Sequence, residues 1–352
     1  MEKEQLLGQN LAKTLSRLSA GNDRLSEAHL ENLASDFDVL SQKALDLVAR
    51  HTGWSYDRLP SVKVVYRHEW IQANIDTFSE AWSNLIEPAI KTSVGTQAAT
   101  ETSKTLALIQ LSLMLGWLSR RVLGQYSFAF SGASKDVDVY YVGFNIVNLE
   151  NRFAFYPREF RLWLALHEIT HFMQFESIKW LNGYFQELVK QSVSFALPNI
   201  GDLAQGLKRL LNQLRSGSLN DMSLGIAGLL GNEQQLEVLK KVQVLMSLIE
   251  GQADLVMSVI GESVLDQAPR FARILKARRL SAKGIQKLLQ QLLGLEAKLR
   301  QYADGEKFLR VIYSELGSAC YEKVFESPES LPTIQELADP QKWLHSKGLK
   351  IA

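Results

Sequence analysis

The pentapeptide His-Glu-Ile-Thr-His at residues 167–171 constrains this chain more than any other feature. It lies in RLWLALHEITHFMQFESI (161–178), a segment of good helix formers without proline or glycine. Residues four apart in an α-helix lie about 40° apart around the axis, so His167 and His171 face the same way. Glu168 is rotated by about 100° from His167. One turn therefore supplies two nitrogen ligands for a metal and one carboxylate that can act as a general base.

The apolar residues around this pentapeptide indicate that its helix is buried on most sides. Unpaired polar groups in such a place are costly. One zinc ion with a bound water would satisfy His167, His171 and Glu168 together, and we expect one ion here. The alternative is that the pentapeptide occurs by chance and that its histidines bond to carbonyl groups of the core.

A third protein ligand is expected, because catalytic zinc usually has three and keeps one open position. Glu176 lies about 140° off the ligand face, which excludes it. VLMSLIEGQADLVMSVIG (244–261) is a second apolar helical segment, and it holds Glu250 and Asp254 on one face. We predict Glu250 as the third metal ligand and Asp254 as the acceptor of the free ring N–H of His167. The alternative is a capping acid or a core salt bridge.

The rest of the chain is mostly helical in its patterning. Apolar spacing predicts helices over 29–51 and 70–90, with a short strand at 61–66 between them. The strand-like segments 125–130 and 137–147 enclose a polar loop and predict a β-hairpin. We therefore expect an α+β fold, mostly α-helical, with a small antiparallel sheet or hairpin beside the metal-binding helix. After residue 157 we expect only helices and loops.

No linker or repeat divides the chain, so we expect one unit over 1–352; if it is divided, 1–105 is an N-terminal helical region and 106–352 holds the metal site.

Composition limits the classes of partner. A net charge of +1 gives no general attraction to nucleic acid or to an anionic membrane. The most apolar run, 106–118, is shorter than the roughly 18–20 residues that span a bilayer. The polar N-terminus is no secretory signal, and Cys320 is the only cysteine, so we expect a cytoplasmic protein.

The two motifs resemble those of the gluzincin metallopeptidases, whose H-E-x-x-H and E-x-x-x-D helices supply these roles. A closer resemblance covers most of the chain from about residue 105 onward. The blocks LGWLSRRVLGQYS, FRLWLALHEITHFMQFESIKWL, IEGQADLVM and QYADGEKFLR look like a family of zincin-like hydrolases. Many members of that family are associated with genes for deazaflavin coenzyme biosynthesis. The family offers no established substrate to transfer, and the association does not make the deazaflavin a cofactor here.

The resemblance also implies a zincin-like fold, in which a β-hairpin or edge strand precedes the metal helix and lies beside the substrate cleft. Segment 137–147 would fill that place, with Asn145 either near the cleft or simply at the end of the strand. An extra donor to the developing oxyanion is common at such a site. Tyr302, in the QYADGEKF block, is the first candidate, followed by Tyr313 and Tyr321. Each of these also fits an ordinary half-buried tyrosine.

Three functions compete on this basis. The first is a zinc-dependent hydrolase of peptides or other amides, in which Glu168 is the general base for a metal-activated water. The second is a catalytically inactive zincin-fold protein that works as a binding or assembly module. The third is a helical structural protein in which the pentapeptide is a coincidence. The sequence indicates neither the identity of a substrate nor the oligomeric state.

Overall fold

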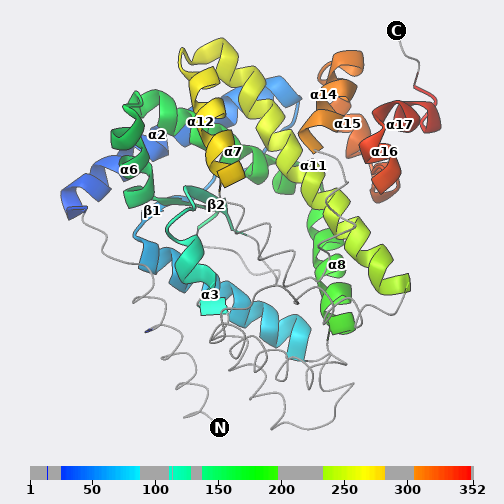
Figure 1. Cartoon of the computed structure of the whole chain (residues 1–352), viewed down its shortest axis with the longest axis horizontal. Coiled ribbons are helices and arrows are strands. Elements are labelled where there is room, and N and C mark those ends of the chain that lie inside the picture. Colours follow the sequence, from blue (N-terminus) through cyan, green and yellow to red (C-terminus); the bar gives the residue numbers. More distant parts are fainter. Residues whose placement is uncertain are drawn as a thin grey trace.

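The structure is a computed structural model that describes residue 14 and residues 25–87, 111–112, 114–127, 137–196, 233–281 and 305–349. Its described part is mostly helical and contains one small sheet (Figure 1). In chain order its elements are α2 (Glu27–Thr52), β1 (Val62–Val65), α3 (Arg67–Ala81), the π-helix Trp82–Ile86, β2 (Gly124–Tyr126), β3 (Val139–Val142), α6 (Gly143–Phe153), α7 (Pro157–Ser177), α8 (Leu181–Ala196), α11 (Glu233–Val264), α12 (Ala268–Ser281), α14 (Gly305–Leu316), α15 (Ala319–Val324), the 3-10 turn Pro328–Ser330, α16 (Ile334–Ala338) and α17 (Pro340–Ser346).

The sheet has three strands in the order β1-β3-β2. Strand β2 pairs with β3 antiparallel, which confirms the predicted hairpin pairing, and Gly124 lies opposite Tyr141. Strand β1 joins the other side of β3 in parallel. The expected α+β fold with a small sheet beside α7 is confirmed, and the parallel strand β1 makes that sheet mixed. Strand β3 is central, so β2 and not segment 137–147 forms an edge.

The two faces of the sheet bury different cores. Val64, Val139 and Tyr141 belong to the main core, which also contains the buried residues of α2 and α7. Val65 and Val142 point the other way, into a smaller cluster with α3. Adjacent strand residues separate in this way because side chains alternate across a pleated strand. Figure 1 shows α3 on one side of the sheet and α2, α6 and α7 on the other.

Most of the predicted helices and strands are present, but they begin or end at other residues than predicted. Helices α2 and α7 and strand β1 match the periodicity from which they were predicted. Helix α11 runs through the apolar segment 244–261 without a break at Gly251. The prediction of one long strand over 137–147 is wrong, because the chain turns from β3 into α6 at Gly143. In the described residues after 157 there are only helices, turns and loops, as expected.

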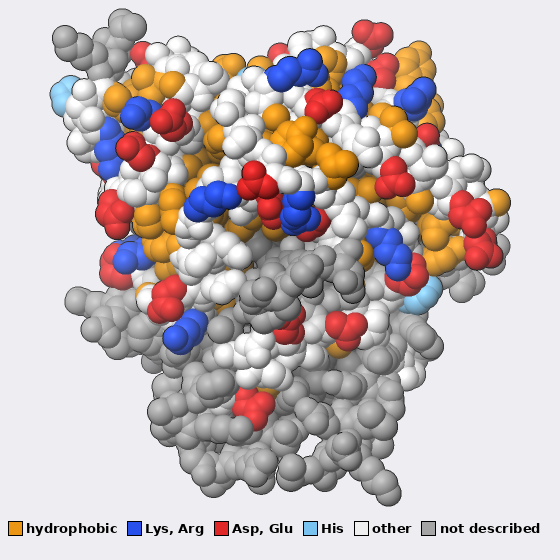
Figure 2. Space-filling view, turned by 180° about the vertical axis from the view of Figure 1, so that it is seen from behind, with side chains coloured by type: hydrophobic (Ala, Val, Ile, Leu, Met, Phe, Trp, Pro, Cys, Tyr) orange, Lys and Arg blue, Asp and Glu red, His pale blue; other side chains and the backbone are white. Residues whose placement is uncertain are grey.

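Helix α11 is the long diagonal helix of Figure 1 and holds part of the main core. Its segment Glu237–Val264 is long and apolar enough to cross a membrane, but 67% of the most apolar window is buried inside the fold. Burial of that kind is also typical of the central helix of a folded domain. On the face in Figure 2, basic and acidic side chains are interspersed over the described surface.

Candidate metal centre

Helix α7 carries four buried polar residues in an otherwise apolar interior: Glu168, Thr170, His171 and Gln174. The helix begins at Pro157, where the absent N–H removes no helical hydrogen bond. The apolar residues buried around these four side chains are Phe160, Leu162, Trp163, Leu164, Ala165, Leu166, Ile169, Phe172, Met173 and Phe175. Thr170 donates to the carbonyl of Leu166 at 2.6 Å, which satisfies it within its own helix. The other three side chains lie at the candidate site.

His167 and His171 converge on one point, as the helical spacing predicts. Their Nε2 atoms lie 3.3 Å apart. The ring planes are nearly perpendicular, at 84°. His167 and His171 have side chains only 14% and 9% exposed. Both rings therefore present the same nitrogen to a shared, mostly enclosed position.

Glu250 of α11 completes a three-residue cluster with these histidines. One carboxylate oxygen lies 3.7 Å from Nε2 of His167 and the other 3.8 Å from Nε2 of His171. One ligand atom from each of the three residues lies within 4.8 Å of the others. The Glu250 side chain is 53% exposed, although its helical segment is apolar. Its exposure makes the cluster reachable from solvent.

The donor set and its spacing fit a zinc ion. Bonds of about 2.0–2.1 Å in a tetrahedral site place ligand atoms roughly 3.3–3.4 Å apart. Here the two Nε2 atoms are 3.3 Å apart, and each of them lies 3.7 or 3.8 Å from a different carboxylate oxygen of Glu250. Two imidazoles and one carboxylate form one of the ligand sets found in catalytic zinc sites. A metal would hold these groups together with only small movements of the side chains.

Gln174 is a site residue that the sequence reasoning missed. Its Oε1 lies 2.9 Å from Nδ1 of His171, on the side of the ring opposite the cluster. Its Nε2 donates to the carbonyl of Ile249 at 3.0 Å and to Oε1 of Gln252 at 2.9 Å, both on α11. A glutamine three residues after the second histidine, in so apolar a helix, was the available signal.

Asp254 lies on the expected side of His167. Its carboxylate is 3.6 Å from Nδ1 of the ring, which is an ion-pair distance and longer than a hydrogen bond. The side chain of Asp254 is 21% exposed. The structure therefore brings Asp254 next to the predicted partner without the predicted direct hydrogen bond.

Glu168 is buried against the sheet and not against solvent. A Cβ atom built on Gly124 of β2 would lie 2.6 Å from Oε1 of Glu168, so the glycine makes room for the carboxylate. Tyr141, opposite Gly124, stacks on Phe37 with ring centroids 3.8 Å apart. Burial raises the pKa of Tyr141, the hydrogen bond between its hydroxyl and that of Ser41 opposes this, and the charge of Glu168 raises the pKa further.

Glu250 is held in place by a close crossing of α11 and α14. A Cβ on Gly251 would collide with the backbone of Gly305 and Glu306. A Cβ on Gly305 would collide with the carbonyl of Ser247. The two glycines let the helix backbones touch directly beside Glu250. This contact joins two blocks that sequence resemblance had marked separately, IEGQADLVM and QYADGEKFLR.

The remaining named residues lie elsewhere. Tyr302 is outside the described residues. Tyr321 is fully buried, and its hydroxyl is 2.9 Å from Nε2 of His51, with Tyr313 packed beside both rings. Asn145 is in α6, where Arg67 donates to its Oδ1 and its Nδ2 donates to the carbonyls of Ser119 and Val122. Asn145 is thus a buried structural residue and not a strand-end residue.

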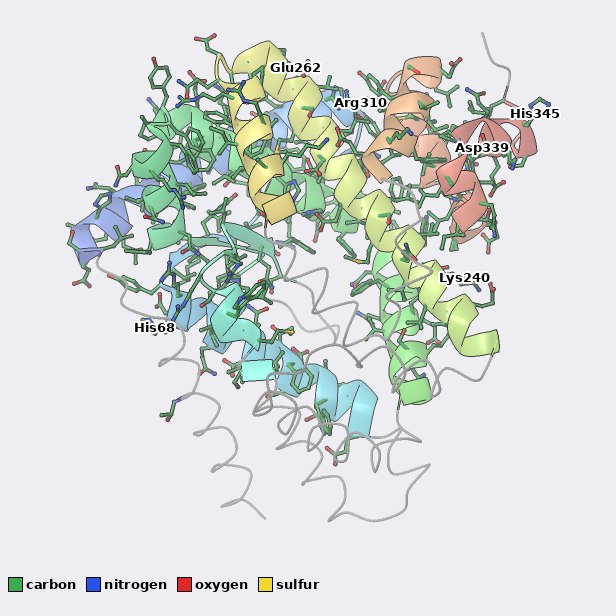
Figure 3. The ribbon with its side chains drawn as sticks, in the orientation of Figure 1. His68, Lys240, Glu262, Arg310, Asp339 and His345 are labelled. Carbon is green, nitrogen blue, oxygen red and sulfur yellow. The ribbon has the colours of Figure 1, made fainter. Side chains whose placement is uncertain are left out.

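Two further ionisable side chains are excluded from the cluster by position. Glu176, already rejected as a ligand, pairs with Arg58 at 2.8 Å. His345 is exposed on α17 and lies at the far edge of the molecule in Figure 3.

A family model of zincin-like metallopeptidases matches residues 8–344. The chain belongs to the zincin-like metallopeptidase family. Because it belongs to this family, the chain is a metallohydrolase. The family implies a metal, typically zinc, and His167, His171 and Glu250 form a group that could bind it. A crystal structure from Chloroflexus aurantiacus, described as that of a candidate hydrolase with a novel fold, is also similar. It shares 26% identity over 97% of this zincin-like chain and 98% of its own, with a TM-score of 0.68. A search of curated proteins gives no match.

Proposed function

We propose that this chain is a zinc-dependent hydrolase of peptide or other amide bonds, with one zinc ion and with Glu168 as the general base. The observation that carries the proposal is the cluster of His167, His171 and Glu250, whose ligand atoms lie within 4.8 Å, with Glu168 on the same turn of α7. Zinc in such a site lowers the pKa of a bound water toward about 7 and polarises a carbonyl group. Residues of the chain itself would transfer the proton and bind the substrate.

Glu168 handles the proton in this proposal. Its carboxylate accepts a proton from the attacking water and delivers it to the nitrogen of the leaving amine. Gly124 and the sheet enclose one side of that carboxylate, which restricts its movement. A fixed carboxylate lowers the entropic cost of the proton transfer.

Strand β2 is the proposed platform for the substrate. Among the described strands β2 pairs only with β3, and we propose its other edge as a template for an extended peptide. Gly124 of this strand also contacts Glu168, so a peptide paired there would pass close to the base. An extended peptide or another amide-containing chain is therefore the proposed substrate class. Tyr302 stays a prediction as the donor to the oxyanion.

The setting of the reaction is also part of the proposal. We infer a cytoplasmic enzyme without a nucleic-acid or membrane partner, because its net charge is +1 and its single cysteine suits a reducing compartment. The link of similar proteins to deazaflavin biosynthesis genes stays an expectation from the resemblance. No step proposed here requires that coenzyme.

The decisive experiment combines metal analysis with a substrate screen. Wild-type protein, purified without chelator, is assayed for zinc and for hydrolysis of a broad peptide and amide library. Glu168→Gln should keep the zinc and lose about 10²- to 10⁴-fold in turnover, the usual contribution of a general base. Glu176→Gln is the matched control, because it removes the same charge from the same helix away from the cluster.

Two outcomes would contradict the proposal. Zinc bound by the wild type without turnover on any substrate would favour the binding or assembly module. No stoichiometric metal at all would favour a coincidental pentapeptide in a structural protein.

A further inference from the structure

Gln174 is a fully buried glutamine whose side chain bridges the two helices that carry the metal ligands. Its three hydrogen bonds are each 2.9–3.0 Å long and go to His171 on α7 and to Ile249 and Gln252 on α11. A buried amide with this many partners holds the bonded groups of both helices in fixed relative positions.

The orientation of this amide follows from its partners. The carbonyl oxygen of Ile249 can only accept a hydrogen bond, so the group facing it must be the NH₂ of Gln174. The other end of the amide, Oε1, is then the atom that faces His171. An amide oxygen only accepts, so Nδ1 of His171 must carry the hydrogen.

The tautomer of His171 is thereby determined. A neutral imidazole with hydrogen on Nδ1 has its lone pair on Nε2. Nε2 of His171 is the atom that lies 3.3 Å from Nε2 of His167 and 3.8 Å from Glu250. The lone pair needed to bind a metal is therefore already on the nitrogen that faces the cluster.

The same amide also fixes α11. Ile249 directly precedes Glu250, so the bond from Gln174 to its carbonyl holds the backbone next to the third ligand. One side chain thus sets the tautomer of one ligand and the position of another. Histidine ligands commonly donate their second ring N–H in this way, and such partners orient the ring.

We propose that Gln174 is a positioning residue that holds His171 in its metal-binding tautomer and pins α11 beside it before any metal arrives. The inference rests on the proposed metal site, but it also makes a statement about the metal-free protein that can be tested separately.

The test uses two variants and a matched control. Gln174→Met has a similar length and removes all three hydrogen bonds. Gln174→Glu keeps an acceptor for His171. Gln252→Met removes only one bond, between the same helices, and leaves Gln174 bonded to both His171 and Ile249. Zinc and cobalt affinities are measured by competition with a chelating dye, and the His171 tautomer by ¹⁵N NMR of the metal-free protein.

We expect Gln174→Met to weaken metal binding about 10- to 100-fold and to abolish the Nδ1–H signal of His171. Gln174→Glu should recover the signal but only part of the affinity, because its carboxylate cannot donate to the carbonyl of Ile249. Gln252→Met should keep both, even where its thermal stability falls as far as that of Gln174→Met. A loss of affinity in Gln174→Met but not in Gln252→Met would show that Gln174 acts by positioning and not only by packing.

Three results would overturn the inference. One is a wild-type His171 with hydrogen on Nε2 in the metal-free protein, which decides the matter even where Gln174→Met fails to fold. Another is an unchanged zinc affinity in folded Gln174→Met. The third is an equal loss of affinity in Gln252→Met. A wild type that has the Nδ1–H tautomer but binds no metal would instead contradict the proposed function and leave the positioning of His171 supported.

Discussion

Gly124 lies against the carboxylate of Glu168, so that a Cβ atom on the glycine would stand 2.6 Å from Oε1. The edge strand β2 and the proposed general base are therefore in direct contact. The two proposed histidine ligands lie on the same helix as Glu168, but their Nε2 atoms face Glu250 on α11. The base and the ligands thus depend on different neighbours and can be perturbed separately.

Replacing Gly124 with alanine should displace Glu168 without removing a ligand. A shift of about 1 Å in a catalytic group can lower the rate about 100-fold, and we expect a loss of that order in kcat with unchanged zinc affinity. Steady-state kinetics and chelator competition provide the two readouts. Gly183→Ala on α8 is the control, because nothing lies within 4 Å of the added carbon. Equal turnover in both variants would contradict the contact's role.

Glu250 and Asp254 should differ in their effect on metal binding. Glu250→Gln removes the charge of a proposed ligand, whereas Asp254→Asn alters only a neighbour 3.6 Å from His167. We expect Asp254→Asn to weaken zinc about 10- to 100-fold and Glu250→Gln to weaken it more. Dialysis against a metal buffer measures both. The reverse order would assign the ligand role to Asp254.

Removal of the metal should stop turnover without unfolding the chain. The main core is apolar and continuous over α2, α7, α11 and α14, so the fold does not need a metal for its stability. Chelation should leave the far-UV circular dichroism unchanged. Added zinc at 100 times its Kd should raise the free energy of unfolding by about 2.7 kcal/mol. Loss of helical signal on chelation would show instead that the metal is structural.

The site was predictable from the sequence where it depends on local periodicity. His167 and His171 share a helix face by spacing alone, and two acids on one face of an apolar segment indicated Glu250 and Asp254. Contacts between distant segments were not predictable in this way. The bond of Gln174 to Ile249 and the contact of Gly124 with Glu168 depend on how α7 meets α11 and β2, which no periodicity encodes.

The wrong strand over 137–147 has a specific tertiary cause. VYYVGFNIV is rich in β-branched and aromatic residues, which favours a strand. The chain instead begins α6 at Gly143, where a Cβ would come within 3.0 Å of Val64 and 3.1 Å of Leu30. Asn145 then makes buried hydrogen bonds with Arg67 and with the carbonyls of Ser119 and Val122. These distant partners outweigh the local preference for a strand.

Replacing Gly305 with alanine should destabilise the fold strongly. The added carbon would collide with the carbonyl of Ser247, and neither backbone can move without separating α14 from α11. Overpacking of this kind costs about 1–3 kcal/mol and occasionally more, and we expect the upper end of that range. Urea unfolding measures the change. Gly317→Ala would be a poor control because of its positive φ of 59°, whereas Gly183→Ala is suitable.

The thermal stability should fall as the pH falls, and part of this decrease should come from the protonation of His51. Burial lowers the pKa of His51, whose Nε2 is 2.9 Å from the hydroxyl of the fully buried Tyr321. In the unfolded chain its pKa is about 6.5. Below that value and down to the folded pKa, the unfolded state binds more protons, so the free energy of unfolding decreases with falling pH. Above about 6.5 the histidine is neutral in both states and makes no such contribution.

The variant His51→Gln should therefore lose less stability than the wild type between pH 7 and pH 5. Glutamine does not titrate, and its amide can still bond to the hydroxyl of Tyr321. The readout is the difference in Tm between wild type and variant across that range, because the other histidines contribute equally to both. The difference should grow in favour of the variant as the pH falls. A constant difference would mean that His51 has the same pKa in the folded and unfolded chain.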